Sequence, residues 1–306
     1  MHIGIISNSD AFIPLAYTLA TQRLQVYIFY SPSQDTYANQ KVAGFIQQTK
    51  IPFTEENDTD SDLYKWLKNS NHDVCFILGY PRLIQLSKLK NCITKLYNIH
   101  FGPLPSFKGP APVFWQLKKG GDKLGLAIHQ LTAKLDDGPV VWLKETDNLS
   151  HYNYQSVNTL FSQLCVEGVI HILRIVTTGF AIPIIEINRI KHAYYKRPVL
   201  QDVLINWQQM SANEICNLIR ACNPWNKGAV TFYNKQELKL MDAIIINDKI
   251  AKDTTAGTIV EDENFLQIAC VDGKIINVNT LYYNDCFIPA YQGVIWGFTK
   301  GKMLAG

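Results

Sequence analysis

A near-continuous apolar run at residues 73–80, D-V-C-F-I-L-G-Y, constrains the fold more than any other stretch of this chain. Runs of this kind are typical of strands that are buried on both faces of a parallel sheet. The other predicted strands and helices alternate along the chain, at residues 3–7, 10–22, 24–30, 38–50, 51–53 and 61–70. Alternation as far as about residue 120 predicts an α/β domain with a doubly wound, mostly parallel sheet.

Two polar residues, Asn98 and His100, stand two positions apart on the next predicted strand. Their side chains are therefore expected on the same face of that strand. The strand ends directly afterwards, because Gly102, Pro103 and Pro105 cannot continue a hydrogen-bonded ladder. In open α/β sheets, ligands bind at the carboxyl ends of the strands. An amide and an imidazole are thus predicted at a position suited to binding.

A carboxylate, Asp136, completes the set of candidate chemical groups. It lies in the turn-like sequence L-D-D-G-P, between predicted strands at 124–131 and 140–144. Imidazole moves a proton readily near neutral pH, and an amide donates to an oxygen that gains negative charge. A nearby carboxylate raises the pKa of an imidazole or orients a water. The alternative is a loop rich in Pro and Gly whose polar side chains bond only the backbone, and N-x-H alone favours that alternative.

The first predicted strand ends in Asn8, Ser9 and Asp10, which lead directly into a helix. Ser9 and Asp10 are good helix N-caps, and a helix N-terminus that follows a strand can also hold an anion. Capping alone and anion binding both fit these residues. The chain has no G-x-G-x-x-G and no Walker pattern, so its motifs do not indicate binding of a dinucleotide or a nucleoside triphosphate.

The chain changes character after a long predicted helix at residues 155–177. Residues 182–199 are irregular, and Ser211 and Glu214 then form a capping box that opens another helix. Four or five short strands follow, separated by turn residues, at 229–232, 238–246, 257–260, 265–269 and 275–281. This pattern predicts a small β-barrel of the oligonucleotide-binding type. We therefore expect domains at 1–190 and 205–306, joined by a linker at 191–204.

Cysteine and histidine spacing does not indicate a metal site. The seven cysteines are scattered without a C-x-x-C pair, so no disulfide framework or zinc site is predicted, and a reduced, cytoplasmic compartment fits. His129, His151 and His171 lack a paired ligand pattern and are predicted to be structural. The chain goes straight into a strand and has no uninterrupted apolar stretch of membrane-spanning length, so we expect neither a leader nor a membrane anchor.

The longer pattern around the candidate groups resembles the folate-dependent formyltransferases. It reads N-I-H-F-G-P-L-P-S-F-K-G, then G-D-K-L-G, then L-D-D-G-P-V. The Asn, His and Asp of this pattern are catalytic in that family, which implies the same role for Asn98, His100 and Asp136. The segment I-N-W…S-A-N-E-I…I-R-A-C-N-P-W, from residue 205, is similar to the methionyl-tRNA formyltransferases. The resemblance covers nearly the whole chain and implies a Rossmann-like catalytic domain followed by the barrel.

The resemblance also implies a co-substrate, 10-formyltetrahydrofolate. The segment G-Y-P-R-L-I resembles the one that lines the pterin site in the family, mostly through backbone groups. The expected cofactor-binding residues are therefore Tyr80, Pro81, Arg82, Leu83 and Ile84. Pro81 has no backbone N–H, so any hydrogen bond from that position is lost. The alternative is an ordinary connection after a strand, with Arg82 on the surface.

Two further segments are implied to contact the acceptor. In the family, the turn that corresponds to Asn8, Ser9 and Asp10 faces the acceptor. The family commonly has S-L-L-P where this chain has G-P-L-P. That departure changes the acceptor pocket but keeps the three catalytic residue types, so we expect Gly102 and Pro103 beside the acceptor.

Charge bears on the identity of the acceptor. Residues 201–306 carry nine basic and eleven acidic side chains, a net charge of −2, whereas a tRNA-binding domain needs a basic stripe. Residues 31–40 contain no Lys or Arg, whereas methionyl-tRNA formyltransferases carry a basic inserted loop there. We therefore expect a small amine acceptor, either a nucleotide-linked amino sugar or an amino acid derivative. Methionyl-tRNA is the alternative, and a non-catalytic binding protein on the same fold is a third reading. The sequence leaves the oligomeric state open.

Overall fold

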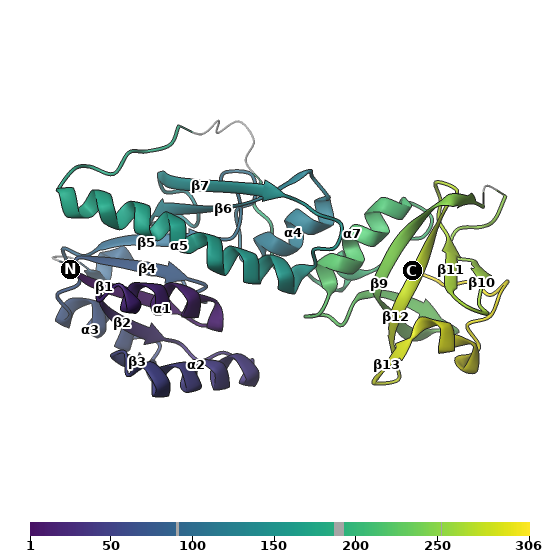
Figure 1. The fold of residues 1–306 in the computed structure, drawn as a ribbon, viewed down its shortest axis with the longest axis horizontal. Coiled ribbons are helices and arrows are strands. Elements are labelled where there is room, and N and C mark those ends of the chain that lie inside the picture. The colour runs from purple at the N-terminus through teal and green to yellow at the C-terminus, as the bar shows by residue number, and fades with distance from the viewer. Residues whose placement is uncertain (90–91, 187–192, 252) are drawn as a thin grey trace. The chain divides into compact units, whose positions relative to one another are not determined.

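The computed structural model describes residues 1–89, 92–186, 193–251 and 253–306 (Figure 1). Its residues cluster into two compact units. Unit 1 is Met1–Gly109, Gly125–Thr146 and Asn158–Tyr194, and unit 2 is Pro110–Leu124, Asp147–Val157 and Tyr195–Gly306. The domain boundaries expected from the sequence stay a prediction, and residues 191 and 192 of the expected linker lie outside the described residues.

Unit 1 is built on a seven-stranded sheet in the order β3-β2-β1-β4-β5-β6-β7. The strands are β1 (His2–Ser7), β2 (Gln25–Tyr30), β3 (Phe53–Glu55), β4 (Val74–Leu78), β5 (Lys95–His100), β6 (Lys123–Gln130) and β7 (Val140–Asp147). The pairs from β3 to β5 are parallel, and β6 runs antiparallel to β5. The predicted doubly wound, mostly parallel sheet is confirmed.

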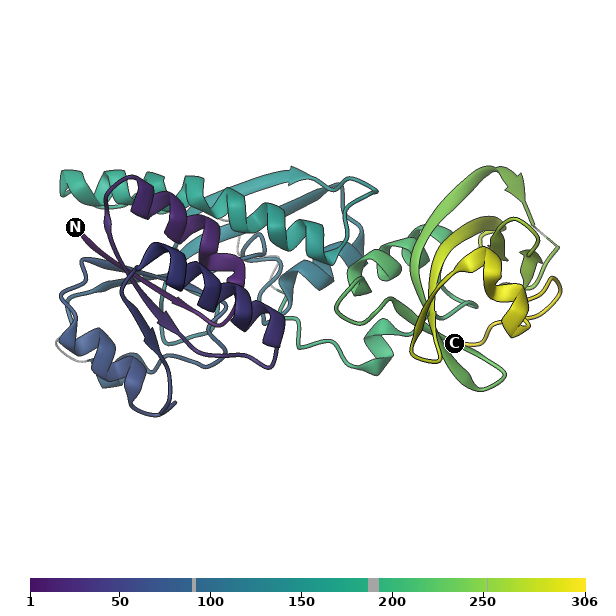
Figure 2. The ribbon, with the colours of Figure 1, turned by 60° about the horizontal axis from the view of Figure 1, so that its bottom comes forward.

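The core of unit 1 forms on both faces of this sheet. All five residues of β4 are buried, as the apolar run predicted. Leu63 and Leu67 of α3 (Asp62–Asn69) pack with Ile6 and Ile77. Two other helices, α1 (Ile13–Thr21) and α5 (Tyr154–Thr178), lie side by side along the sheet in both views (Figures 1 and 2), and α2 (Thr36–Thr49) follows β2 in the chain.

The helix predicted at residues 10–22 begins differently from the prediction. Asp10–Phe12 form a short 3-10 turn, and α1 starts only at Ile13. Pro14 explains the difference, because it has no N–H to donate to the carbonyl of Asp10. Ser9 caps the turn as predicted, since its hydroxyl accepts from the N–H of Ala11 at 3.4 Å.

The long predicted helix is α5, which packs as a core helix. Its length and composition alone would allow it to cross a membrane, a test that the core helices of soluble proteins also pass. Phe161, Cys165 and Val169 on α5 are fully buried. The ring of Phe161 contacts that of Phe101 with the centroids 5.5 Å apart. One face of this helix therefore packs in the core of unit 1, and the other face is exposed.

Unit 2 holds an antiparallel sheet that curves into a half-barrel, with the order β10-β11-β12-β9-β8 and β13 paired to β12. The strands are β8 (Ala229–Tyr233), β9 (Gln236–Ile250), β10 (Ile259–Glu261), β11 (Leu266–Ala269), β12 (Lys274–Tyr283) and β13 (Cys286–Pro289). β13 and the 3-10 helix Ala290–Trp296 that follows it are not among the predicted elements. A two-residue turn, Asn284-Asp285, joins β12 to β13 with φ of 48° and 59°. Asn-Asp is a weaker hairpin signal than Asn-Gly, which explains the omission.

Two helices pack together within unit 2, α4 (Pro112–Lys119) and α7 (Ala212–Cys222). The predicted capping box is confirmed, because the Ser211 hydroxyl accepts from the N–H of Glu214 and the Glu214 carboxylate accepts from the N–H of Ser211. Arg220 of α7 donates to the side chain of Asn148 and to the carbonyls of Leu149 and Tyr152. A short helix, α6 (Leu200–Val203), lies within the expected linker.

Candidate active site

The three predicted catalytic side chains meet in unit 1, on β5 and in the loop after β6. Asn98 Nδ2 lies 3.5 Å from Asp136 Oδ1, and His100 Nδ1 lies 3.7 Å from the same oxygen. His100 and Asp136 are each only 6% exposed. The structure thus brings an amide, an imidazole and a carboxylate together in a largely dry environment. Their catalytic role stays a prediction.

A fourth side chain, His129, belongs to this cluster although the sequence analysis predicted a structural role for it. Its Nε2 lies 3.0 Å from Asn98 Nδ2 and 3.6 Å from Asp136 Oδ1. The pairing of the strands explains its position, since Asn98 on β5 is directly opposite His129 on β6. A lone histidine in an apolar strand gives no such signal until the register of the two strands is known.

Close backbone packing holds the loop that carries Asp136. A Cβ at Gly138 would lie 1.8 Å from the carbonyl oxygen of Gln130, so only glycine fits there. Asp136 itself has a φ of +49°, which is uncommon for a residue with a side chain. The N–H of Gly109 donates to Asp136 Oδ2 at 2.9 Å. The backbone of the loop is therefore held by the packing at Gly138, and the Asp136 carboxylate by the N–H of Gly109.

Hydrogen bonding indicates where the protons of the two imidazoles lie. His100 Nε2 is 2.6 Å from the carbonyl oxygen of Phe107, which can only accept, so Nε2 carries the proton. His129 Nδ1 is likewise 3.1 Å from the carbonyl oxygen of Gln130. His129 Nε2 then accepts from the Asn98 amide. His100 Nδ1 is left with its lone pair on the side of Asp136.

Burial and charge act in opposite directions on these groups. Burial lowers the pKa of His100, and the nearby Asp136 carboxylate opposes this effect only in part. Burial alone would raise the pKa of Asp136, but its contacts with His129, His100 and the Gly109 N–H together lower that pKa. At neutral pH the pair is therefore a carboxylate beside a neutral imidazole.

The segment predicted to contact the folate follows β4. Gly79 turns the chain with a φ of +76°. The hydroxyl of Tyr80 and the guanidinium of Arg82 both donate to Glu56, whose side chain is 1% exposed. Pro81 and Leu83 are exposed and Ile84 is buried in the core. Arg82 is thus tied to a buried carboxylate rather than standing alone on the surface.

The segments predicted to contact the acceptor follow β1 and β5, the strands on either side of β4. A Cβ at Gly79 would lie 2.9 Å from Asn8 Oδ1, so the turns after β1 and β4 touch. Asp10 pairs with Lys41 at 3.0 Å. Gly102 is buried and Pro103 is half-buried directly after β5. Together with residues 80–84, these segments line the carboxyl ends of β1, β4 and β5, which are adjacent in the sheet.

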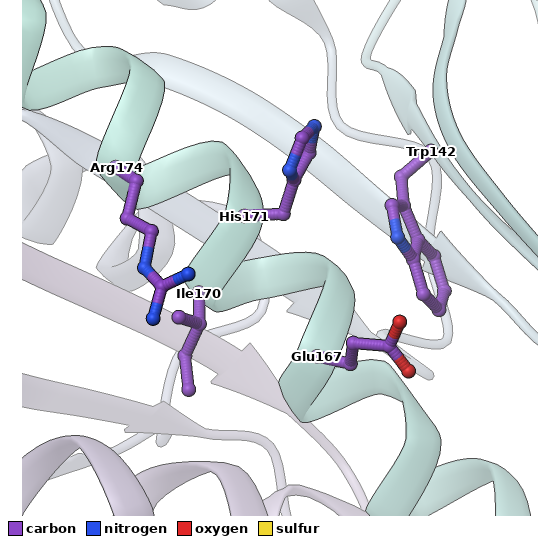
Figure 3. A pocket seen from close by; sticks show the side chains of 5 residues that line it. All are labelled: Trp142, Glu167, Ile170, His171 and Arg174. Atoms are coloured by element: carbon purple, nitrogen blue, oxygen red, sulfur yellow. The ribbon is translucent and has the colours of Figure 1, made fainter.

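A hollow of about 420 Å³ lies elsewhere in unit 1, lined by Trp142, Glu167, Ile170, His171 and Arg174 (Figure 3). Trp142 comes from β7 and the other four residues from α5. None of them is a predicted site residue, so this hollow is separate from the cluster around Asp136. Among the described residues, no group of three or more His, Cys, Asp or Glu side chains is arranged to hold a metal ion.

Two family models match the chain. The model described as "Formyl transferase" matches residues 17–173, and the model "Formyl transferase, C-terminal domain" matches residues 200–286. The methionyl-tRNA formyltransferase of Clostridioides difficile (strain 630) is 24% identical over 248 residues, which are 80% of this chain and 76% of that protein. The bifunctional polymyxin resistance protein ArnA of Wigglesworthia glossinidia brevipalpis is 30% identical over 258 residues, 78% of this chain and 36% of that protein.

Among solved structures, the N-formyltransferase of Helicobacter canadensis has a similar fold. It superposes with a TM-score of 0.72 at 17% identity, covering 91% of this chain and 99% of that one. That structure is a complex with folinic acid and dTDP-3-aminofucose. At this level of identity the likeness shows the shared fold alone.

Proposed function

The chain belongs to the formyl transferase family, and we propose that it transfers the formyl group of 10-formyltetrahydrofolate to the primary amine of a small acceptor. The acceptor we propose is a nucleotide-linked amino sugar or an amino acid derivative. The observation that carries the proposal is the convergence of half-buried Asn98 with buried His100 and Asp136 in one cluster. The Helicobacter canadensis relative, bound to a formylated folate and an amino sugar nucleotide, supports the classes of donor and acceptor. We place the reaction in the cytoplasm.

In the first step, the neutral amine attacks the formyl carbon and a new C–N bond forms. The formyl oxygen becomes an oxyanion, and the amine must lose a proton. Nδ1 of the neutral His100 accepts that proton, and the carboxylate of Asp136 at 3.7 Å stabilises the resulting imidazolium. Lowering of the His100 pKa by burial keeps the ring neutral and ready to accept.

In the second step, the bond between the formyl carbon and folate N10 breaks. The imidazolium of His100 returns its proton to N10, so that tetrahydrofolate leaves as a neutral amine. The products are a formamide and tetrahydrofolate, and His100 is again neutral. Asp136 remains ionised throughout, because its contacts lower its pKa.

The amide of Asn98 stabilises the oxyanion between these two steps. One of its N–H groups donates to His129 at 3.0 Å, and the other is directed at Asp136 over a long 3.5 Å. The oxyanion replaces Asp136 as the acceptor of the second N–H, and the hydrogen bond to His129 keeps the amide of Asn98 in its orientation. Loss of an oxyanion donor costs about 10²–10³ in kcat.

The flanking segments complete the proposal. Tyr80, Pro81, Arg82, Leu83 and Ile84 contact the folate, chiefly through backbone groups. The acceptor lies against Asn8, Ser9, Asp10, Gly102 and Pro103. Support comes from their shared location at the carboxyl ends of adjacent strands.

Methionyl-tRNA is the second candidate acceptor. The Clostridioides difficile relative, matched over 80% of this chain, favours it. The net charge of −2 over residues 201–306, and the absence of Lys and Arg from residues 31–40, favour a small acceptor.

The deciding experiment is a formyl-transfer assay with 10-formyltetrahydrofolate against charged initiator tRNA and a panel of nucleotide amino sugars. We expect turnover with at least one small amine and none with the tRNA. Turnover with methionyl-tRNA alone would overturn the choice of acceptor. The absence of transfer to every amine, and of folate binding by calorimetry, would overturn the proposed activity.

A further inference from the structure

Three consecutive residues, Phe107, Lys108 and Gly109, bracket the candidate site. The carbonyl of Phe107 accepts from His100 at 2.6 Å, and the N–H of Gly109 donates to Asp136 at 2.9 Å. Between them, the ammonium of Lys108 pairs with Asp137 at 2.5 Å. Phe107 therefore contacts His100, Gly109 contacts Asp136, and Lys108 contacts Asp137, the residue next to Asp136.

The ion pair between Lys108 and Asp137 is partly shielded from water. The side chain of Lys108 is only 13% exposed, and that of Asp137 is 32% exposed. Surface pairs contribute little because water screens them, whereas a partly desolvated pair interacts more strongly. This short, partly buried contact therefore restrains Asp137, although ordering the long Lys108 side chain costs conformational entropy.

Lys108 is itself anchored at its backbone. Its N–H donates to the carbonyl of Ala193 at 3.1 Å, and the residue forms a β-bridge with Tyr194. The pair therefore links the Asp136 loop to residues 193 and 194 of unit 1. The loop needs such a link, because Asp136 has a φ of +49°, a conformation that persists only when its surroundings enforce it.

We propose that Lys108 and Asp137 are positioning residues that hold the Asp136 carboxylate at its distance from His100. They act through the backbone of the adjacent residues and do not touch the reacting groups. This inference rests on the proposed function for its kinetic consequences, while its structural consequence can be measured without turnover.

The kinetic test compares Lys108→Met, Asp137→Asn and the double variant, with Lys144→Met as a matched control. Lys144 also forms an ion pair in unit 1, with Glu167 at 3.2 Å, and neither residue is a predicted site residue. We expect each single variant to lose about 10- to 100-fold in kcat, with KM for the folate donor changed less than about threefold. The double variant should lose less than the product of the two single losses, because both substitutions break the Lys108–Asp137 pair.

Lys108→Arg keeps the positive charge and should restore most of the lost kcat, whereas Lys144→Met should behave as the wild type. Multiplicative losses in the double variant, or an equal loss in Lys144→Met, would overturn the inference. Thermal unfolding of every variant identifies general destabilisation, and Asp137→Asn substitutes for Lys108→Met if the latter does not fold.

An NMR titration of ¹⁵N-labelled histidines separates this inference from the proposed function. Asp136 opposes the lowering of the His100 pKa, so loosening Asp136 in the double variant, which leaves the net charge unchanged, should move the His100 midpoint to lower pH. A midpoint that stays or rises would overturn the inference even in an inactive protein. A shifted midpoint without formyl transfer in the wild type would uphold it and overturn the proposed function.

Discussion

The neutral imidazole of His100 is the residue on which the proposed chemistry depends most. As a base it is active above its pKa, and burial lowers that pKa from its ordinary value of about 6.5. We therefore expect the acid limb of kcat/KM to have its midpoint below about 6.5. Because Asp136 opposes this lowering, Asp136→Asn should move the limb to lower pH and reduce kcat. Rates of formyl transfer from about pH 5 to 8 test both effects, and a limb that moves to higher pH would contradict them.

His129 is expected to matter through Asn98 rather than through proton transfer. His129→Leu removes the acceptor of the 3.0 Å contact from the Asn98 amide and leaves that N–H unpaired in a buried place. We expect kcat to fall about tenfold or more, with the pH profile unchanged in shape. His151→Leu, an exposed position, is the control. Identical kcat in His129→Leu and wild type would remove His129 from the site.

A second buried histidine, His72, predicts sensitivity to acid. It is 3% exposed, and neither ring nitrogen has a hydrogen-bond partner among the described residues. Burial lowers the pKa of His72 to about 4, so the unfolded chain binds a proton at higher pH than the folded one. The stability that neutral His72 contributes is therefore fully present above about pH 6.5 and is lost as the pH falls toward 4.

From pH 7 to 5 this histidine should cost about 2 kcal/mol of unfolding free energy. His72→Phe, which keeps an aromatic ring against Trp66, should remove that part of the loss. Urea unfolding at the two pH values measures it, with His151→Phe as control. Equal pH dependence in His72→Phe and wild type would show that His72 is already solvated or paired.

The sequence predicted Asn98, His100 and Asp136 because the residue types stand in a pattern that chemistry requires. It did not place His129 with them, because that contact depends on the antiparallel register of β5 and β6. It also could not find the pairing of Arg82 with Glu56, which joins the segments after β3 and β4, two strands that β2 and β1 separate in the sheet. Contacts across strands depend on the topology and register of the sheet, so local sequence patterns do not predict them.

Between elements, the packing of α5 on β7 is a close approach that a single substitution can test. A Cβ at Gly168 of α5 would lie 2.5 Å from the ring of Trp142. Gly168→Ala should therefore destabilise unit 1 by about 1–3 kcal/mol, measured by chemical unfolding. Gly44 in α2 has no atom within 4 Å of such a Cβ, so Gly44→Ala should stabilise by about 0.4–1 kcal/mol. The same sign for both substitutions would refute this account.

Most elements could be predicted from local signals, and the exceptions have physical causes. The boundaries of β1, β4 and α5 follow from apolar periodicity and lie close to the prediction. α1 starts later than predicted because Pro14 has no N–H for an α-helical hydrogen bond. The β12–β13 hairpin turns on Asn284 and Asp285, which lack the glycine that usually marks such turns.

The charge of residues 201–306 predicts weak binding of nucleic acid to this part of the molecule. Residues 201–306 have a net charge of −2, so few condensed counterions can be released from tRNA. We expect unacylated tRNA at micromolar concentration not to inhibit formyl transfer to the small acceptor at about 150 mM salt. Strong inhibition that disappears with added salt would instead reveal a local basic surface and favour the tRNA alternative.

The interleaving of the two units along the chain limits how this protein can be recombined with its relatives. Residues 110–124 and 147–157 belong to unit 2, and α4 and Asn148 contact α7 there. A chimera spliced once, near residue 195, would separate α7 from both of its partners. Grafts that also transfer these two short inserts keep the native neighbours, and only they should yield soluble hybrid enzymes.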